Sequence, residues 1–359
     1  MRAGRAPRRR IARRLALALL GVLAGAGLLE GAVRARHYLR SGSLRRAHAF
    51  VLDARTGLTI PLQNRHGAVR TDSHGFRSPE VEVPKPPGTL RLAFLGASTT
   101  FCAEASSNEA TWPHLVWKAV AAAYPRARVD YVNAAVGGYG VESSIQNFER
   151  RVAPCAPDVV VIYHATNDIA GDTRELARER GVYSGHADRD SWLARWSMAY
   201  FLIEKNVLFH LRSSAARREA GRLGFEPRAL SAGFRERLER LVHTCQRSAS
   251  LVVLVTFAPR VRADQTPDER LAASASSLYY MPYLSPAGLL AAFEEYDRVI
   301  GEVARATGAL LVEGEDTIPA DAVHYADSVH FTDAGCARMA ARIAGPLVAS
   351  ETLRRLAER

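Results

Sequence analysis

Short runs of apolar residues alternate with longer amphipathic stretches along most of the chain. The short runs are bounded by turn residues, as in strands that are buried on both faces of a sheet. The longer stretches carry apolar residues at helical spacing. The pattern predicts strands at Leu90–Leu95, Arg128–Val132, Val159–Tyr163, Leu251–Phe257 and Leu310–Val312. It predicts helices at Trp112–Tyr124, Val141–Val152, Phe234–Gln246, Leu289–Ala306 and Thr332–Leu347.

Strands that are joined by helices favour a parallel sheet, because right-handed crossovers place the connecting helices on its two faces. The alternation therefore predicts an α/β fold over residues 90–350, a three-layer α/β/α sandwich with a five-stranded parallel sheet. In such a sheet, side chains that follow the strands gather at the carboxyl edge, where open α/β sheets carry their chemistry.

Two stretches depart from the alternation. Residues 34–89 begin with a basic segment and continue with a segment rich in turn-forming residues. This composition predicts a linker or an arm that packs on the domain. Residues 172–235 form a charged insertion with a cluster of aromatic residues, namely Trp192, Trp196, Tyr200, Phe201 and Phe209. Three interpretations of this insertion stay open: ordinary packing, a cap over an active site, or a face against a bilayer.

The N-terminus has the pattern of a membrane segment. Seven arginines precede an apolar run, Leu15–Leu29, which continues past Glu30 to Val33. We expect a basic cytoplasmic tail at 1–14 and a transmembrane signal-anchor at 15–33, with the rest of the chain exported. Ala24-Gly25-Ala26 resembles a signal-peptidase site, so cleavage of this segment is the open alternative.

The basic character of the chain lies entirely at this end. Residues 1–50 contain twelve arginines and one acid, so their net charge is +11. This is the net charge of the whole chain, and residues 51–359 are therefore neutral. The charge therefore indicates membrane topology rather than a nucleic-acid-binding face, and no nucleic-acid partner is expected.

Four cysteines fall in the part that is expected to be exported. Cys102, Cys155, Cys245 and Cys336 match no metal-binding spacing, and no metal site is expected. In an oxidising compartment four cysteines allow three disulfide pairings. Free buried thiols are the alternative.

Four short motifs follow the predicted strands in order. Gly96-Ala97-Ser98 follows the first strand, Gly137-Gly138 the second, and Ala165-Thr166-Asn167 the third. Asp327-Ser-Val-His330 precedes the last helix. All four fall at one edge of the predicted sheet.

These residue types suit nucleophilic catalysis. A carboxylate three residues before a histidine can fix the imidazole tautomer and leave the other nitrogen free to act as a base. Backbone N–H groups and an asparagine amide can donate to a developing oxyanion. Asp321 and His324 have the same spacing as Asp327 and His330, but Thr332 directly after the second pair is a good N-cap for the last helix, which favours His330.

Over residues 70–350 the chain resembles the SGNH hydrolases, the GDSL esterase/lipase superfamily, and within it the membrane-anchored bacterial members that carry a stretch like Thr71-Asp-Ser-His-Gly-Phe-Arg77. The resemblance implies a flavodoxin-like sheet and ester hydrolysis without metal or cofactor. It implies that Ser98 is the nucleophile, His330 the general base and Asp327 the residue that orients it. It also implies an oxyanion hole formed by the N–H groups of Ser98 and Gly138 with the Asn167 side chain. Two positions depart from the family pattern: Ala97 replaces an aspartate, and Ala165 replaces a glycine.

The expected function is that of a serine esterase or deacylase that hydrolyses carboxylic esters, of a lipid or an O-acylated glycan, through an acyl-enzyme. We expect a single-pass protein of the bacterial cytoplasmic membrane with a periplasmic or extracellular catalytic domain. One alternative is an O-acetyltransferase that acts on cell-surface polysaccharide, and another is a non-catalytic surface protein with a relic site. The sequence does not distinguish the natural substrate, the acyl length or the oligomeric state.

Overall fold

A five-stranded parallel sheet forms the centre of the larger structural unit of the computed structural model. Its strands lie in the order β4-β3-β5-β6-β7. They span Thr89–Gly96 for β3, Arg128–Asn133 for β4, Val159–Tyr163 for β5, Leu251–Val255 for β6 and Leu310–Val312 for β7. This flavodoxin-like order reverses direction beside β3, so the edge after β3 and β5 is a topological switch point. The predicted fold class is confirmed.

The structure describes residues 6–41, 50–182, 192–204 and 224–359. It divides the chain into two compact units, one made of residues 1–46 with 189–210 and the other of residues 47–188 with 211–359. Each unit is described by itself.

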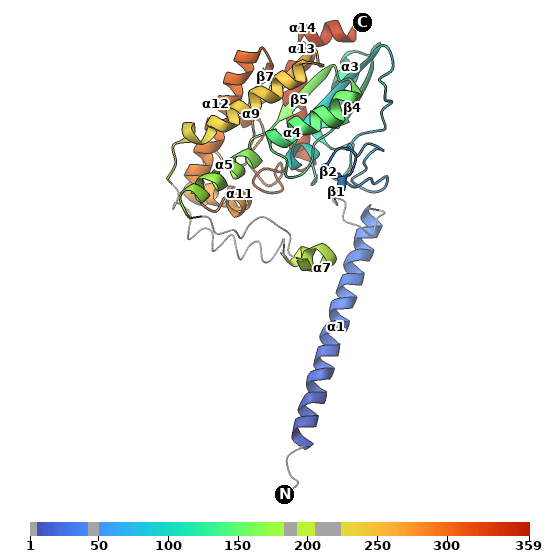
Figure 1. Ribbon diagram of the computed structural model, residues 1–359, viewed down its shortest axis with the longest axis vertical. Helices are drawn as coiled ribbons and strands as arrows, with labels where there is room; N and C mark the ends of the chain where they lie inside the picture. The colour runs from blue at the N-terminus through green and yellow to red at the C-terminus, as the bar shows by residue number, and fades with distance from the viewer. Residues whose placement is uncertain (1–5, 42–49, 183–191, 205–223) are drawn as a thin grey trace. The chain divides into compact units, whose positions relative to one another are not determined.

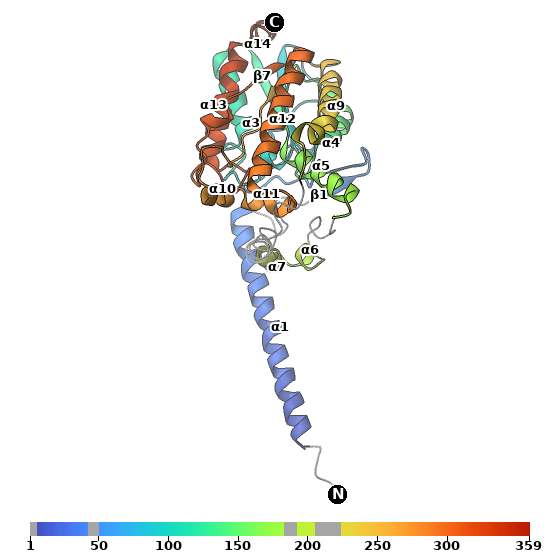
Figure 2. The ribbon, with the colours of Figure 1, turned by 90° about the vertical axis from the view of Figure 1, so that its left-hand side faces the viewer.

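The helices cover both faces of the sheet (Figures 1 and 2). On one face, α3 (Trp112–Ala123) packs against α13 (Asp333–Ala349). On the other face, α9 (Pro227–Gln246) packs against three helices. These are α4 (Val141–Asn147), α5 (Thr166–Glu179) and α12 (Pro286–Thr307). The central strands β5 and β6 are buried along their whole length, which explains why their sequences are continuous apolar runs.

Shorter elements complete this unit. They are the hairpin of β1 (Phe50–Asp53) and β2 (Leu58–Pro61), the helices α2 (Ser98–Phe101), α10 (Pro267–Ala273), α11 (Ala275–Tyr280) and α14 (Glu351–Ala357), the 3-10 turns Ala153–Cys155 and Glu315–Thr317, and a π-helical turn, Phe148–Val152.

The predicted elements agree with the observed ones except near some of their ends. Strand β6 stops at Val255, two residues before the predicted end at Phe257. Helices α9 and α12 begin several residues before the predicted starts, because Pro227 and Pro286 occupy their first turns. Glu226 and Ser285 cap them through side-chain oxygens. The helix predicted over Val141–Val152 changes to the π-helical turn after Asn147.

The stretch predicted as a linker or a packed arm, 34–89, divides between a helix and the sheet domain. Helix α1 (Ala6–Ser41) takes its first residues, and residues 50–88 pack on the larger unit. Phe76 and Arg77 are fully buried there, and Val69 and Thr71 are buried as well. Periodicity does not reveal this packing, because single buried side chains separated by turns hold the segment in place.

The smaller unit contains α1 with α6 (Trp192–Trp196) and α7 (Met198–Ile203). Within α1, Arg13–Leu39 is long and apolar enough to cross a membrane. Its most apolar 18-residue window has a mean hydropathy of 2.0 and is not buried. Part of the predicted insertion 172–235 continues α5 as far as Glu179. Phe209 of its aromatic cluster lies outside the described residues.

All four cysteines are free and buried. The structure thus has the free-thiol alternative rather than any of the three disulfide pairings.

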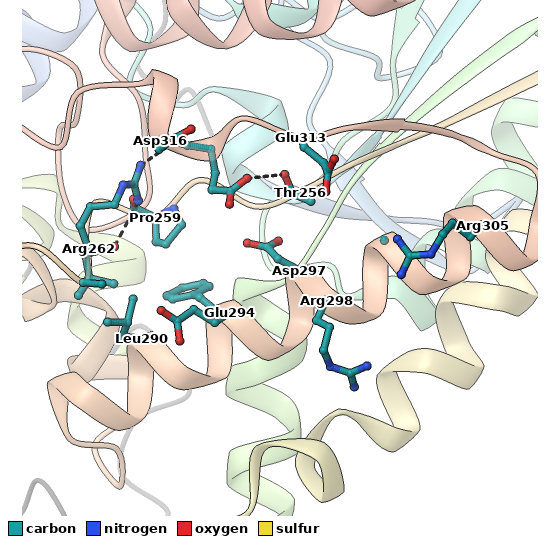
Figure 3. Close-up of a pocket in the computed structure, with 15 residues that line it drawn as sticks. Thr256, Pro259, Arg262, Leu290, Glu294, Asp297, Arg298, Arg305, Glu313 and Asp316 are labelled. Carbon is teal, nitrogen blue, oxygen red and sulfur yellow. Dashed lines mark hydrogen bonds between the residues drawn. The ribbon is translucent and has the colours of Figure 1, made fainter.

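A hollow of about 470 Å³ lies between α12 and the segments that follow β6 and β7 (Figure 3). Its walls carry charges of both signs, with Glu294, Asp297 and Glu313 on one hand and Arg298 and Arg305 on the other. Asp297 accepts a hydrogen bond from the N–H of Phe257, and burial raises the pKa of this carboxyl group.

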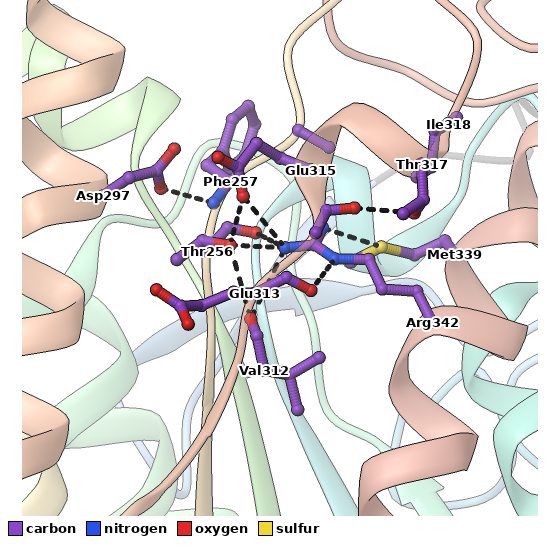
Figure 4. A network of polar contacts seen from close by, with 12 residues as sticks. Thr256, Phe257, Asp297, Val312, Glu313, Glu315, Thr317, Ile318, Met339 and Arg342 are labelled. Atoms are coloured by element: carbon purple, nitrogen blue, oxygen red, sulfur yellow. Dashed lines mark hydrogen bonds and ion pairs between the residues drawn. The ribbon is translucent and has the colours of Figure 1, made fainter.

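A network around Arg342 borders this hollow and fastens α13 to the sheet (Figure 4). The buried guanidinium donates to the carbonyl oxygens of Thr256 and Glu313, both at 2.9 Å, directly after β6 and β7. Because the guanidinium satisfies carbonyls at two strand ends, it fixes the helix that follows the Asp327–His330 loop.

Gly96 limits the turn that ends β3. A Cβ at this position would collide with the Thr100 side chain and lie 2.8 Å from the carbonyl oxygen of Tyr163. We expect Gly96→Ala to lower the free energy of unfolding by at least about 2 kcal/mol, since a backbone carbonyl cannot move aside. Chemical denaturation of the full chain in detergent measures this.

Gly171→Ala is the matched control, because Gly171 lies inside α5 with nothing within 4 Å of an added Cβ. It should leave stability unchanged or raise it by up to about 1 kcal/mol. Equal effects of the two substitutions would contradict the steric explanation.

Candidate active site

Ser98 begins the short helix α2 at the carboxyl edge of the sheet. The helix directly follows β3, Gly96 and Ala97, and it ends after one turn at Cys102, which has a left-handed backbone (φ 57°). Because Gly96 has no side chain, Thr100 folds back over the strand end. This sharp turn lets a buried strand deliver the Ser98 hydroxyl to the edge of the sheet.

The structure brings Ser98, His330 and Asp327 into one hydrogen-bonded chain. His330 Nε2 lies 2.8 Å from Ser98 Oγ, and His330 Nδ1 lies 2.8 Å from Asp327 Oδ2. The other carboxylate oxygen, Oδ1, accepts the N–H groups of Val329 and His330. With Nδ1–H donating to Asp327, Nε2 is left as the acceptor for the Ser98 hydroxyl.

Opposing effects set the pKa values of this pair. Burial by itself lowers the pKa of His330, but the adjacent Asp327 carboxylate outweighs it and raises that pKa above the ordinary value. Burial likewise raises the pKa of Asp327, and the charge and hydrogen bonds of His330 outweigh it and lower that pKa. The aspartate therefore stays ionised and stabilises a protonated imidazole.

The second Asp-x-x-His pair has the same local geometry in a different place. His324 Nδ1 lies 2.8 Å from Asp321 Oδ1, which also accepts the N–H groups of Val323 and His324. Asp321 is exposed, and His324 does not line the cavity at Ser98. The sequence spacing thus produces the same turn twice, and only His330 meets the serine.

Gly138 and Asn167 lie at the same cavity as Ser98. Gly138 has a positive φ of 86°, which a glycine adopts without strain. Asn167, in the first turn of α5, donates one N–H of its amide to the carbonyl oxygen of Tyr139 at 2.9 Å. This bond fixes the orientation of the amide and leaves its second N–H for another acceptor.

A buried polar cluster supports the loop that carries Gly138. Asp168 accepts the N–H of Val141 at 3.0 Å, and a Cβ on Gly140 would lie 2.9 Å from the same carboxylate oxygen. Burial raises the pKa of Asp168 to about 7. Beside it, His164 is joined to Ser144 by a 2.8 Å hydrogen bond, and burial lowers the pKa of His164 to about 3.

The cavity at Ser98 has a volume of about 510 Å³. Its lining combines apolar and polar side chains, among them Phe50, Phe101, Glu104, Arg174, Tyr280, Met281 and Val329. Ala165, the residue that replaces the family's glycine, does not line it and is instead buried in the main core. The hollow of Figure 3 contains none of the predicted site residues.

Sequence reasoning missed the role of Arg77, although it noted the motif that contains it. Its guanidinium is fully buried, and the N–H groups donate hydrogen bonds to oxygen atoms around the end of α2. The acceptors are the carbonyls of Ala68, Phe101, Cys102 and Ser107 and the side chain of Asn108. Arg77 therefore holds the nucleophile helix from its C-terminal end, where a cation also suits the helix dipole.

A second missed contact holds the histidine loop. Ser328 Oγ accepts the N–H groups of Ser276 and Ser277, and Ser276 Oγ accepts the N–H of Ser328 at 3.0 Å. The reciprocal bonds join α11 to the loop between Asp327 and His330. No sequence motif signals this pairing, because the partners are 52 residues apart.

Comparisons with known proteins give one family match and several similar solved structures. Residues 94–338 match the model of the GDSL-like lipase/acylhydrolase family. One similar solved structure is the acetylxylan esterase Axe2 from Geobacillus stearothermophilus, with 17% sequence identity and a TM-score of 0.44, covering 73% of this chain and 95% of that chain. Another is LAE5, an α/β hydrolase from the metagenome of Lake Arreo, Spain, with 14% identity and a TM-score of 0.45, covering 72% of this chain and 94% of that one. No curated protein sequence matches significantly.

The family match covers more than half of the chain and includes the segments that carry Ser98, Gly138, Asn167, Asp327 and His330. The chain therefore belongs to the GDSL-like lipase/acylhydrolase family and is a hydrolase that acts on ester bonds.

Proposed function

We propose that the chain is a serine esterase that cleaves carboxylic esters through an acyl-enzyme on Ser98. The observation that carries the proposal is the continuous hydrogen-bonded chain from Ser98 through His330 to Asp327. The same complete arrangement speaks against a relic site.

In the proposed mechanism, His330 Nε2 takes the proton of Ser98 as its Oγ attacks the ester carbonyl. The developing oxyanion receives hydrogen bonds from the N–H groups of Ser98 and Gly138 and from the free N–H of Asn167. His330 then gives the proton to the departing alkoxide. A water molecule, deprotonated by the same nitrogen, attacks the acyl-enzyme carbonyl. The bond to Ser98 Oγ then breaks, the acid is released, and His330 returns the proton to Ser98.

Solvent access favours hydrolysis over transfer to a glycan hydroxyl. The His330 side chain is 22% exposed and lines an open cavity, so water can reach an acyl group on Ser98. A transferase would need to exclude water from this position. The substrate we propose is the ester of a lipid or an O-acylated glycan, since the lining offers both apolar and polar contacts.

We further propose that α1 anchors the enzyme in a membrane as a single span. The apolar window within Arg13–Leu39 and the arginines before it support an N-terminus on the cytoplasmic side and a catalytic unit on the outer side.

The assignment of the base predicts a kinetic difference between the two histidines. His330→Ala and Ser98→Ala should each lower kcat by a factor on the order of 10³ or more, and the double variant should be hardly slower, because the residues act as one unit. His324→Ala is the matched control and should lower kcat far less. Steady-state hydrolysis of chromogenic esters measures this, with circular dichroism to confirm folding. A folded His330→Ala variant that is milder than His324→Ala would contradict the assignment.

The charge of Asp327 predicts the acid limb of the pH profile. Activity should fall as pH drops through the pKa of His330, because a protonated Nε2 cannot accept the serine proton, and that pKa lies above the ordinary value of 6.5. Asp327→Asn removes the charge that raises it, so the limb of kcat/KM should move to lower pH while the maximal rate falls. An unchanged or higher limb would show that Asp327 does not set the pKa of the base.

The anchor proposal predicts retention of the N-terminal segment. The full chain should stay with the membrane fraction after alkaline extraction, as a spanning helix does. N-terminal sequencing of the mature protein is the decisive check. A sequence that starts near Gly27 would instead make the enzyme a secreted, soluble one.

A further inference from the structure

Glu30 is the one acid in the apolar run of α1, and the proposed chemistry does not use it. Its carboxylate accepts three hydrogen bonds from the start of α7: from Ser197 Oγ at 2.8 Å, from the N–H of Met198 at 3.0 Å and from the N–H of Ala199 at 2.9 Å. These N–H groups belong to the first turn of a helix, where they have no partner within the helix itself.

Arg34 completes the junction between the two segments. Its Nε donates to Glu30 Oε1 at 2.6 Å, and its Nη2 donates to the carbonyl oxygen of Trp196 at 2.9 Å. Around these bonds the small or flexible side chains of Ala194, Met198 and Ala199 are buried. The polar contacts thus fix α6 and α7 at one level along α1.

That level lies near the outer end of the apolar run. The run from Leu15 to Val33 is centred on Ala24, and Glu30 is six residues further along. At about 1.5 Å per residue this is about 9 Å from the centre, inside a half-thickness of about 15 Å for the hydrocarbon region. A carboxylate at such a depth is costly unless it is bonded, and α7 together with Arg34 supplies the bonds.

The two short helices present apolar side chains on their outer surface. Trp196 is 73% exposed, and Leu193 and Ile203 are 45% and 42% exposed. Tryptophan is enriched at the level where a bilayer meets water, and short helices with one apolar face bind there.

We propose that α6 and α7 lie in the outer membrane–water interface beside α1, with Leu193, Trp196 and Ile203 among the lipid acyl chains and Glu30 as the residue that holds the helices at this depth. The inference rests on the proposed anchoring of α1. Lipid is the expected occupant, because Glu30 fixes the exposed side chains at the depth of acyl chains, and the apolar window of α1 is itself unburied. The segment then works as a second membrane contact of the enzyme.

The test uses the full chain, reconstituted in vesicles of phosphatidylcholine and phosphatidylglycerol, with one labelled position at a time. Leu193→Cys reports on α6, Leu20→Cys on the centre of the span, and Glu358→Cys on an exposed site of the catalytic unit. Each carries an environment-sensitive fluorophore, and unsubstituted protein corrects for its four buried thiols. Nitroxide groups near either end of the lipid acyl chain then quench by depth.

We expect the Leu193 label to be quenched best by the shallow nitroxide and the Leu20 label by the deep one. The Glu358 label gives the quenching of a position outside the two proposed membrane contacts. Adding Glu30→Leu should remove most of the quenching at Leu193 and leave Leu20 unchanged. Glu30→Gln keeps an acceptor oxygen and should retain more quenching than Glu30→Leu.

The outcomes separate the two proposals. Quenching at Leu20 but not at Leu193 would overturn the interfacial placement and leave the anchor intact. The same holds if the unquenched Leu193 label has a blue-shifted emission, because a protein surface rather than lipid then covers it. Quenching at neither position would refute the anchor and the inference together. Full quenching at Leu193 in Glu30→Leu would overturn the role of Glu30.

Discussion

The hydrogen bond between Ser98 and His330 joins residues that are 232 positions apart in the sequence, and much of the structure serves to hold its two ends. On the serine side, Gly96 allows the tight turn after β3, and Arg77 donates hydrogen bonds to the carbonyl oxygens at the C-terminal end of α2. On the histidine side, hydrogen bonds between Ser276 and Ser328 hold the loop, and Arg342 fastens α13, the helix that follows it, to the sheet. A hydrogen bond tolerates only a few tenths of an ångström, so rigid supports on both sides are the structural requirement of the proposed chemistry.

Much of this arrangement is predictable, because buried parallel strands have a distinctive sequence pattern. Val159–Tyr163 and Leu310–Val312 have the bounds that the apolar runs predict. The order of motifs after the strands also predicts which residues share an edge, and the structure places Ser98, Gly138, Asn167, Asp327 and His330 at one cavity. The turn-rich pattern of residues 34–89 left a linker and a packed arm both open, and no pattern indicated the supports at Arg77 and Ser276. Those contacts depend on buried polar groups whose partners are distant in the sequence, and neither periodicity nor local spacing reports them.

The smaller unit also depends on contacts between residues that are distant in the sequence. An acidic residue is unfavourable within the apolar run of a membrane-spanning helix, and the sequence alone does not explain Glu30. The structure supplies one in the bonds from Ser197, Met198 and Ala199, which join the aromatic insertion to α1. The insertion was open to three interpretations, and for its described part, residues 192–204, we propose the one against the bilayer.

The central claim is that acyl transfer takes place on Ser98. The most direct measurement is peptide mass spectrometry of the full chain after reaction with a fluorophosphonate, which traps an activated serine covalently. The account predicts that the label is found on the peptide containing Ser98, that it is absent in Ser98→Ala, and that it forms far more slowly in His330→Ala. Labelling of another serine, such as Ser144 beside His164, or an undiminished rate in a folded His330→Ala variant, would contradict it.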